Sequence, residues 1–250
     1  MIELAGQVAL VTGGNRGIGR AAALLLARAG ADVALTFHTR ADQAEAAARE
    51  IQSLGRRTYV GGGDLADPDV VDRLIAGVRR EFGGLDIFVA NAGVWPPEEI
   101  VLADMPVARW RRTMAANLDS VFLSTRAALS VMRSGGRVVI VSSTAGQRGE
   151  AFHADYAATK GALIALTKSL AVEYAPDIVV NCIAPGWVDT DMSTPAYTAD
   201  NRERIRQSIP LRRIATTEDI GGPILFLCSA LARHITGEVL NVNGGSVLCG

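Results

Sequence analysis

Residues 7–30 read QVALVTGGNRGIGRAAALLLARAG, and this stretch decides the fold. The apolar run at residues 7–12 predicts a short buried strand, and the alanine- and leucine-rich run that ends at Gly30 predicts a helix. Glycines separate the two. A strand that breaks into glycines before a helix leaves backbone N–H groups free at the positive helix end, which suits a phosphate. The stretch therefore favours the first βα unit of a dinucleotide-binding fold over an ordinary tight turn.

The glycines of this loop have separate expected uses. Gly13 makes the turn, and Gly17 lets the backbone approach a pyrophosphate. Gly19 lets the helix pack closely on the strand. Because all of these uses serve one ligand, the loop predicts a nicotinamide dinucleotide as coenzyme.

The end of the second strand, expected at residues 32–37, indicates which coenzyme is used. A carboxylate there would bind the ribose diol and repel a 2′-phosphate, but residues 33–41 contain no Asp or Glu. Arg16 in the loop and Arg40 past the strand are instead two potential partners for that phosphate. The pattern favours NADP(H). The alternative is that Arg40 merely begins the exposed face of a helix at residues 41–54.

Strands and helices alternate along the rest of the chain. Further strands are expected at residues 58–61, 85–90, 137–141, 178–184 and 239–242, and helices after residue 68, at residues 106–132, around residue 156 and near residues 217–229. No Pro- or Ser-rich linker interrupts the pattern. It predicts an α/β fold, a single doubly wound Rossmann-type domain over residues 1–250, with a parallel seven-stranded sheet flanked by helices.

A second informative stretch, residues 142–160, reads SSTAGQRGEAFHADYAATK. Tyr156 and Lys160 are four residues apart, so on a helix they share one face. An ammonium near a phenol lowers the phenol pKa from about 10, which makes the tyrosine a usable acid or base at neutral pH. A serine hydroxyl at the preceding strand end would hold the oxygen that exchanges the proton. The alternative is a core tyrosine beside a solvated lysine.

Composition excludes several other classes of protein. A formal net charge of -1 gives no electrostatic reason to expect nucleic acid or an anionic membrane as partner. No apolar run is long enough to span a bilayer and no leader segment is recognisable, so a cytoplasmic location is expected. No metal site is expected either, because the cysteines and histidines are scattered without ligand spacing: Cys182, Cys228, Cys249, His38, His153 and His234.

Over essentially its whole length the chain resembles the classical short-chain dehydrogenase/reductase family. The resemblance is carried by three motifs in their usual order: Thr12-Gly13-x-x-x-Gly17-Ile18-Gly19, Asn91-Ala92-Gly93 and Tyr156-x-x-x-Lys160. It implies a catalytic tetrad of Asn117, Ser143, Tyr156 and Lys160. In that tetrad Asn117 would hold a water in a proton relay through Lys160, although from the sequence alone Asn117 could equally be a polar residue at a helix irregularity.

The resemblance also implies the contacts with the coenzyme. Asp64 would contact the adenine, Asn91 would approach the adenosine ribose, and Thr190 would donate to the nicotinamide carboxamide. The full expected set is Gly13, Asn15, Arg16, Gly17, Ile18, Gly19, His38, Arg40, Asp64, Leu65, Asn91, Ala92, Gly93, Tyr156, Lys160, Pro185, Gly186, Val188 and Thr190. Residues 191–209 match the family's mobile substrate lid, and Trp95, Trp187 and Met192 are expected to line the substrate site. The tail from Ile235 resembles a tetramer contact, which implies a homotetramer.

Within the family, the chain is most similar to 3-oxoacyl-carrier-protein reductases. The expected activity is an NADPH-dependent, reversible hydride transfer between nicotinamide and a carbonyl or secondary alcohol, with a small ketone or a 3-oxoacyl thioester as substrate. Residues 132–136 are less basic than the carrier-docking segment of many such enzymes, although Arg133 and Arg137 remain candidates. Free ketones or short acyl thioesters are therefore expected to react at least as well as carrier-bound chains. The alternatives are an NAD-dependent alcohol or sugar dehydrogenase, and a non-catalytic NADP-sensing protein.

Overall fold

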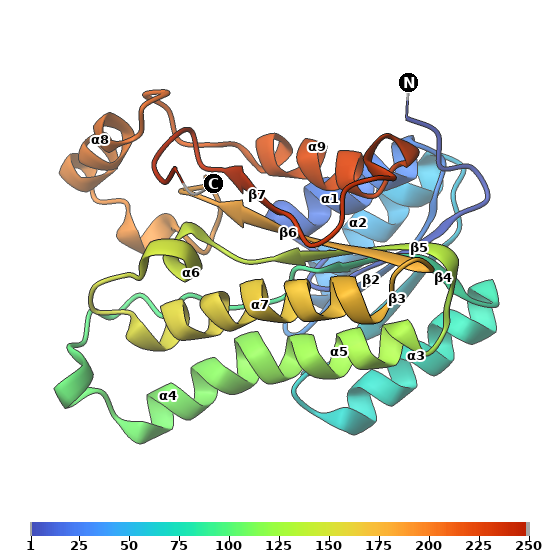
Figure 1. The fold of residues 1–250 in the computed structure, drawn as a ribbon, viewed down its shortest axis with the longest axis horizontal. Coiled ribbons are helices and arrows are strands. Elements are labelled where there is room, and N and C mark those ends of the chain that lie inside the picture. Colours follow the sequence, from blue (N-terminus) through green and yellow to red (C-terminus); the bar gives the residue numbers. More distant parts are fainter. Residues whose placement is uncertain (1, 249–250) are drawn as a thin grey trace.

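A seven-stranded parallel sheet in the order β3-β2-β1-β4-β5-β6-β7 forms the centre of the computed structural model, which describes residues 2–248 (Figure 1). The strands are β1 (Val8–Val11), β2 (Asp32–Phe37), β3 (Thr58–Gly62), β4 (Leu85–Ala90), β5 (Met132–Val141), β6 (Ile178–Pro185) and β7 (Val239–Val242). The chain order reverses between β1 and β4, and ligands of open parallel sheets bind at such a reversal, beyond the carboxyl ends of the strands. The predicted fold class is confirmed.

Helices cover both faces of the sheet. They are α1 (Gly17–Arg28), α2 (Ala41–Ser53), α3 (Pro68–Phe82), α4 (Val107–Met114), α5 (Ser120–Leu129), α6 (Thr144–Arg148), α7 (Ala154–Glu173), α8 (Ala199–Ser208) and α9 (Thr217–Leu227). Buried residues of α1, α2 and α9 pack on one face, and those of α3, α5 and α7 pack on the other. Figure 1 shows these two layers above and below the strands.

Side chains that alternate along each strand explain why helices pack on both faces of the sheet. In β1, Ala9 and Val11 belong to one buried cluster, whereas Val8 and Leu10 belong to the other. Side chains of a strand point alternately to opposite faces, so a strand covered on both sides is apolar at every position. This is why the strand at residues 7–12 was recognisable as a continuous apolar run.

The predicted helix at residues 106–132 was wrong at its end. The segment is divided into α4, a π-helical turn (Ala115–Asp119) and α5, which ends at Leu129. Met132 already pairs with Leu85, and the register shifts before the next pair because Gly135, with φ of 86°, lies in an irregular start of β5. The strand core at residues 137–141 was predicted from its β-branched residues, whereas the irregular start carries no such signal.

Candidate active site

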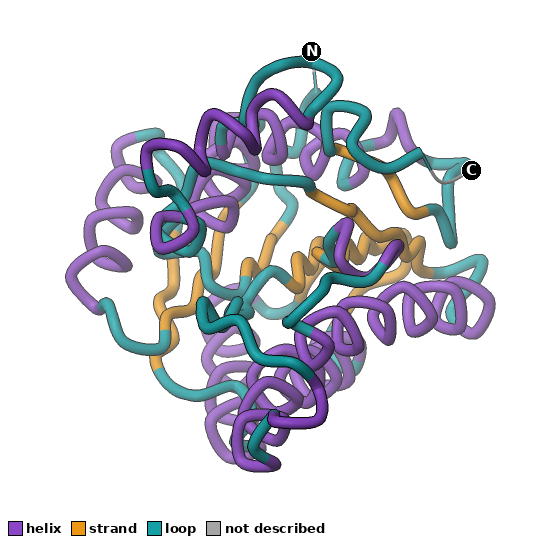
Figure 2. Tube along the Cα trace, turned by 90° about the vertical axis from the view of Figure 1, so that its left-hand side faces the viewer, coloured by secondary structure: helices purple, strands orange, loops and turns teal. Residues whose placement is uncertain are grey.

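A cavity of about 1230 Å³ opens beyond the carboxyl ends of the strands, at the reversal between β1 and β4. The loops after β1, β2, β4, β5 and β6 contribute its walls. Figure 2 views this side of the molecule and shows the loops lying in front of the strand ends. Every residue of the expected catalytic and coenzyme sets lines this cavity except Gly19 and Asn117.

The glycine loop fits a phosphate-bearing ligand. Gly13 and Gly17 have φ of 64° and 54°, a left-handed conformation that favours glycine. A Cβ on Gly19 would lie 2.3 Å from the carbonyl oxygen of Gly13, so only glycine allows this close packing. Arg16 precedes α1 without capping it through its side chain, and the first turn carries no acidic residue. The start of α1 therefore suits a pyrophosphate.

Hydrogen bonds between Thr12 and Asn91 stabilise this loop. The Thr12 hydroxyl accepts hydrogen bonds from the backbone N–H groups of Asn91 (2.9 Å) and Ala92 (3.0 Å). The Asn91 side-chain amide donates to the Thr12 carbonyl at 2.9 Å. The Asn91 side chain thus connects β4 to the glycine loop. This structural role was not part of the prediction, which gave Asn91 only a contact with a ribose.

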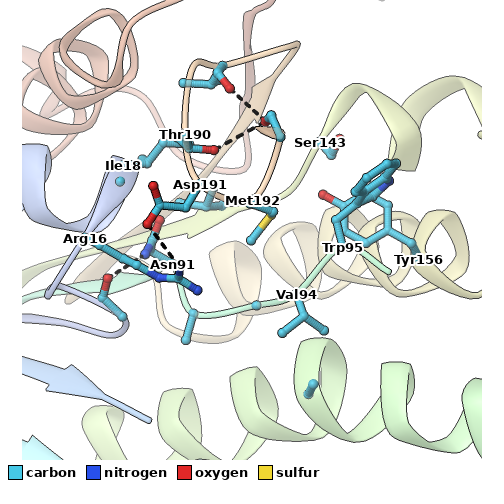
Figure 3. Close-up of a pocket in the computed structure, with 18 of the residues that line it drawn as sticks. Arg16, Ile18, Asn91, Val94, Trp95, Ser143, Tyr156, Thr190, Asp191 and Met192 are labelled. Carbon is cyan, nitrogen blue, oxygen red and sulfur yellow. Dashed lines mark hydrogen bonds and ion pairs between the residues drawn. The ribbon is translucent and has the colours of Figure 1, made fainter. Parts of the chain in front are cut away.

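Basic side chains line the cavity in the loops after β1 and β2. Arg40 and His38 follow β2 and line the wall, and the Asn15 side chain donates to the Arg40 carbonyl at 3.5 Å. Arg16 instead reaches across the cavity mouth to Asp191, with 3.3 Å between its Nη1 and the carboxylate (Figure 3). Both side chains of that ion pair are exposed, so the pair is weak and the Arg16 guanidinium can exchange partners.

The remaining expected coenzyme contacts form two further walls. Asp64 follows β3, and its side chain accepts from the Ala66 N–H at 3.0 Å. On the opposite side, a Cβ added to Gly17 would lie 3.5 Å from the Thr190 methyl group, so the loop after β6 faces the glycine loop directly. Leu65, Ala92, Gly93, Pro185, Gly186 and Val188 also line the cavity.

Tyr156 and Lys160 lie together in the first turns of α7. Both are buried, with 9% and 5% of their surfaces exposed. The Lys160 ammonium donates to the Val141 carbonyl at 2.9 Å and lies 5.7 Å from the centre of the Tyr156 ring. Ser143 ends the loop after β5 and caps α6 by accepting from the Ala145 N–H at 3.1 Å. Figure 3 shows Ser143, Tyr156 and Trp95 at the same end of the cavity.

Burial sets the protonation of this pair. It raises the pKa of Tyr156 to about 12, against an opposing hydrogen bond from Ser143, and the nearby Glu150 carboxylate adds to the rise. Burial also lowers the pKa of Lys160 to about 8. The expectation that Lys160 would lower the phenol pKa was therefore wrong for the protein alone, because burial dominates and the ammonium is bound to Val141. The Tyr156 phenol is therefore protonated at neutral pH.

Asn117 lies in the π-helical turn and is fully buried. Its amide oxygen accepts from the Val94 N–H at 2.7 Å, and its amide nitrogen donates to the Val94 carbonyl at 2.8 Å. A Cβ on Gly93 would lie 2.9 Å from Asn117 Oδ1 and 3.6 Å from Lys160 Nζ, so the three residues are neighbours. These two bonds leave one N–H and one lone pair of the amide for another partner, so the amide and the backbone carbonyls of the π turn are both candidates to hold the predicted water.

A buried ion pair supports the start of α7 and was missed in the sequence. Asp155 has no exposed surface, and its carboxylate accepts from Arg109 Nε at 3.0 Å and from the Thr113 hydroxyl at 2.7 Å. Burial acts to raise the pKa of Asp155, but the hydrogen bonds from Arg109 and Thr113 outweigh it and hold that pKa below its usual value. The pair joins α4 to the residue before Tyr156. Because Arg109 and Asp155 are far apart in the sequence, no local sequence pattern indicates that they pair.

Metal ligation finds no support in the described part of the chain. No group of three His, Cys, Asp or Glu side chains converges there. Cys182 and Cys228 are buried and unbridged, and Cys249 lies outside the described residues. Within residues 2–248, none of the helices has the length and apolar character needed to cross a membrane.

Sequence comparison relates the chain to a known family model and to known proteins. Residues 13–246 match a family model described as enoyl-(acyl carrier protein) reductase. A 3-oxoacyl-(acyl-carrier-protein) reductase of Aquifex aeolicus is 38% identical, with 98% of each chain covered. Nodulation protein G of Azospirillum brasilense is 36% identical, with 96% of this chain and 97% of the relative covered.

Two solved structures are similar in both fold and sequence. A short-chain dehydrogenase/reductase of Brucella melitensis described as a glucose/ribitol dehydrogenase superposes with a TM-score of 0.92 at 34% identity, covering 99% of both chains. A short chain dehydrogenase of Burkholderia cenocepacia J2315, solved in complex with NADP, has a TM-score of 0.92 at 37% identity, covering 98% of this chain and 99% of that one.

Proposed function

We propose that this chain reduces ketones or short 3-oxoacyl thioesters with NADPH. The premise is that the chain belongs to the short-chain dehydrogenase/reductase family and is an oxidoreductase that uses a nicotinamide coenzyme. The observation that carries the proposal is the position of Tyr156. Its protonated phenol, with Ser143 beside it, lies in one cavity with the glycine loop. A proton donor and a dinucleotide cradle in the same cavity are what carbonyl reduction requires.

NADPH is proposed over NADH on the basis of Arg16 and Arg40. Both line the cavity, Arg40 just after β2 and Arg16 in the loop after β1, and no carboxylate directly follows β2 to repel a 2′-phosphate. The NADP held by the similar Burkholderia cenocepacia enzyme supports the same choice. When bound, the coenzyme supplies the hydride in reduction and accepts it in oxidation.

The chain's own residues supply the proton and the geometry. Tyr156 donates its proton to the carbonyl oxygen of the substrate, and the Ser143 hydroxyl orients that oxygen. The Lys160 ammonium stabilises the phenolate that remains and would bind the ribose of the nicotinamide. Asn117 keeps the π turn in place through Val94, so that backbone carbonyls there hold the water that resupplies the proton.

A free ketone or short acyl thioester is proposed ahead of a carrier-bound chain. Arg133 lies at the start of β5 and Arg137 near its middle, and neither lines the cavity at the carboxyl end of the strand. Arg133 already pairs with Asp86 at 2.6 Å, and Arg137 donates to the Gly135 carbonyl at 2.6 Å. Arginines that are paired and outside the cavity would give an acidic carrier little steering.

The test is a panel of ketones assayed with NADPH and with NADH. The panel includes one 3-oxoacyl group linked to a carrier protein and the same group on a small thiol, each at low and high salt. We expect NADPH to be preferred and the small thioester to match the carrier in kcat/KM. A large, salt-sensitive preference for the carrier would restore fatty-acid synthesis as the role. Oxidation of sugars or alcohols with NADH as the product would favour the activity described for the Brucella melitensis relative.

A homotetramer in the cytoplasm completes the proposal. Large apolar side chains are exposed on α5 and α7, Phe122 at 51% and Val172 at 81%, and Leu248 beyond β7 is 90% exposed. Two separate apolar surfaces on one chain suit the two kinds of two-fold contact in a dihedral tetramer.

A further inference from the structure

The end of the cavity near Tyr156 has an aromatic wall. Trp95, after β4, stacks on His153 with 4.7 Å between ring centroids and an interplanar angle of 23°. Trp187, after β6, meets Trp95 edge-on at 6.2 Å, and Tyr197 lies 5.9 Å beyond Trp187. These rings come from segments far apart in the sequence. Together they make an apolar surface beside the proton donor that suits the carbon skeleton of a substrate.

One carboxylate interrupts this apolar wall. Glu150, between α6 and α7, lines the same cavity, and its side chain is only 22% exposed. Its Oε1 accepts from the Trp95 indole N–H at 3.3 Å and lies 3.9 Å from His153 Nδ1. No residue in the described part of the chain donates to Oε2. Oε2 is not among the fully buried polar atoms, and Glu150 lines the cavity, so a hydrogen-bond donor on a ligand can reach this oxygen.

The surroundings keep this carboxylate in place. His153 is 3% exposed, and its Nδ1 lies 3.2 Å from the Ala151 carbonyl, which holds the imidazole ring against Trp95. Trp95 in turn fixes Oε1 of Glu150. The Glu150 charge is also near enough to the phenol to contribute to the raised pKa of Tyr156. The carboxylate is therefore a rigid acceptor within a short reach of the reacting group.

We propose that Glu150, set in the Trp95 and Trp187 wall, forms a subsite that selects ketones bearing a hydrogen-bond donor, a hydroxyl or an ammonium group, at the end of the molecule opposite the carbonyl. The inference rests on the proposed reduction of ketones at Tyr156 and narrows its substrate class. Neither the sequence motifs nor the relatives assign a function to Glu150. An aromatic spacer between carbonyl and donor fits best, because its ring lies among the indoles.

The test uses three acetophenones that differ only at the para position: hydroxymethyl, aminomethyl and ethyl. Each is measured for kcat/KM with NADPH, and its binding is measured by quenching of tryptophan fluorescence, since Trp95 lies in the subsite. Glu150→Gln keeps an acceptor for Trp95 but removes the charge. Glu98→Gln is the matched control, because Glu98 lines the cavity and its side chain is 69% exposed.

We expect the wild type to prefer at least one donor-bearing ketone over the ethyl ketone by about tenfold to a hundredfold, and Glu150→Gln to lose most of that preference. The preference is the ratio of kcat/KM for a donor-bearing ketone to kcat/KM for the ethyl ketone within one protein, so a general effect of Glu150→Gln on Tyr156 cancels. The better of the two donors identifies the source: a stronger aminomethyl preference indicates a cationic substrate, and a stronger hydroxymethyl preference a neutral one.

Equal use of all three ketones by the wild type would overturn the proposal, as would a preference that Glu150→Gln and Glu98→Gln change alike. If no ketone is reduced, the proposed function fails separately. In that case the binding preference of the wild type, and its loss in Glu150→Gln, still decides whether the subsite exists.

Discussion

Tyr156 owes its chemistry to burial. With its pKa raised to about 12, the phenol stays protonated throughout the neutral range, although it is a weaker acid than free tyrosine. Lys160, with its pKa lowered to about 8, remains mostly charged at neutral pH and becomes neutral above it. The protein alone therefore holds Tyr156 in the protonated form that carbonyl reduction would use, rather than as the phenolate that alcohol oxidation would use.

The pH dependence of the two directions should differ accordingly. For ketone reduction, kcat/KM should be nearly constant between about pH 6 and 7, because the Tyr156 phenol stays protonated and Lys160 stays charged, and it should fall near pH 8 as Lys160 loses its proton. For alcohol oxidation, kcat/KM should rise with pH, because the active phenolate becomes more abundant. Steady-state rates between pH 6 and 9 measure both. A reductive kcat/KM that already falls steadily from pH 6 to 7 would show that the phenol titrates near neutrality.

The proposed preference for NADPH can be tested at two other side chains, Arg16 and Arg40. Arg16→Ala with Arg40→Ala should weaken NADPH binding by roughly tenfold or more per arginine, because charge-assisted hydrogen bonds to the 2′-phosphate are lost. NADH, which lacks that phosphate, should bind within about threefold of wild type. Fluorescence titration with each coenzyme measures this. Arg28→Ala is the control, since Arg28 is an exposed arginine of α1 outside the cavity wall.

Equal weakening of NADPH and NADH in the double variant would show that these arginines do not read the 2′-phosphate. A partial result is also informative, because Arg16 pairs with Asp191 in the structure. If only Arg40→Ala discriminates between the coenzymes, Arg16 serves the contact with the loop after β6 instead.

Some residues of the site were visible in the sequence because their chemistry requires a local spacing. Tyr156 and Lys160 share a helix face, and the glycines of the first loop follow a strand directly. Glu150 and Arg109 carry no such spacing. Their partners, Trp95 and Asp155, are 55 and 46 residues away in sequence, so only the folded chain brings them together.

Among the elements, α4 and α7 are joined by charge rather than by apolar contact alone. Arg109→Ala should destabilise the protein by about 3–5 kcal/mol, because it leaves the Asp155 carboxylate buried without its ion-pair partner. Denaturant unfolding measures the free energy. Arg111→Ala, on the exposed side of the same helix, should change it by no more than about 0.5 kcal/mol. A loss below about 1 kcal/mol for Arg109→Ala would mean that the pair contributes little.

The helices and strands were predictable where the apolar residues follow a recognisable pattern along the chain. The expected ranges of β2, β4 and β7 match the structure, because an apolar run bounded by turn residues marks a buried strand. The helix at residues 106–132 was not resolved into α4, the π turn and α5, since a π turn changes hydrogen bonding without changing the residue pattern. Residues 191–209 were predicted only as a substrate lid, with no helix assigned; they include α8, whose exposed polar residues show little apolar periodicity.

At the scale of the whole molecule, the assembly is the next property to test. Light scattering should give a mass of four 26.3 kDa chains. Phe122→Arg should shift the mass toward smaller assemblies, because it places a charge on an apolar surface of α5. Leu54→Arg, a comparably apolar residue at the end of α2 in the other layer, is the control. A monomer in the wild type would contradict the proposed tetramer.

The fold as a whole was predictable because the βα alternation leaves few topologies for a parallel sheet. The position of the cavity follows from the same rule, since the strand order reverses between β1 and β4. What the alternation does not specify is the lining of the substrate end. Trp95, Glu150 and Trp187 come from three separate loops, and loops vary while the sheet beneath them stays the same.

The most direct test of the account is the rate of NADPH oxidation in the presence of a reactive ketone, measured for wild type and for Tyr156→Phe at matched saturation with coenzyme. Removing only the phenol hydroxyl should lower kcat by roughly 10²–10⁴-fold, with NADPH binding and thermal unfolding nearly unchanged, because the proton donor alone is lost. A Tyr156→Phe enzyme that retains activity within a few-fold of wild type would contradict the assignment of Tyr156 as the acid.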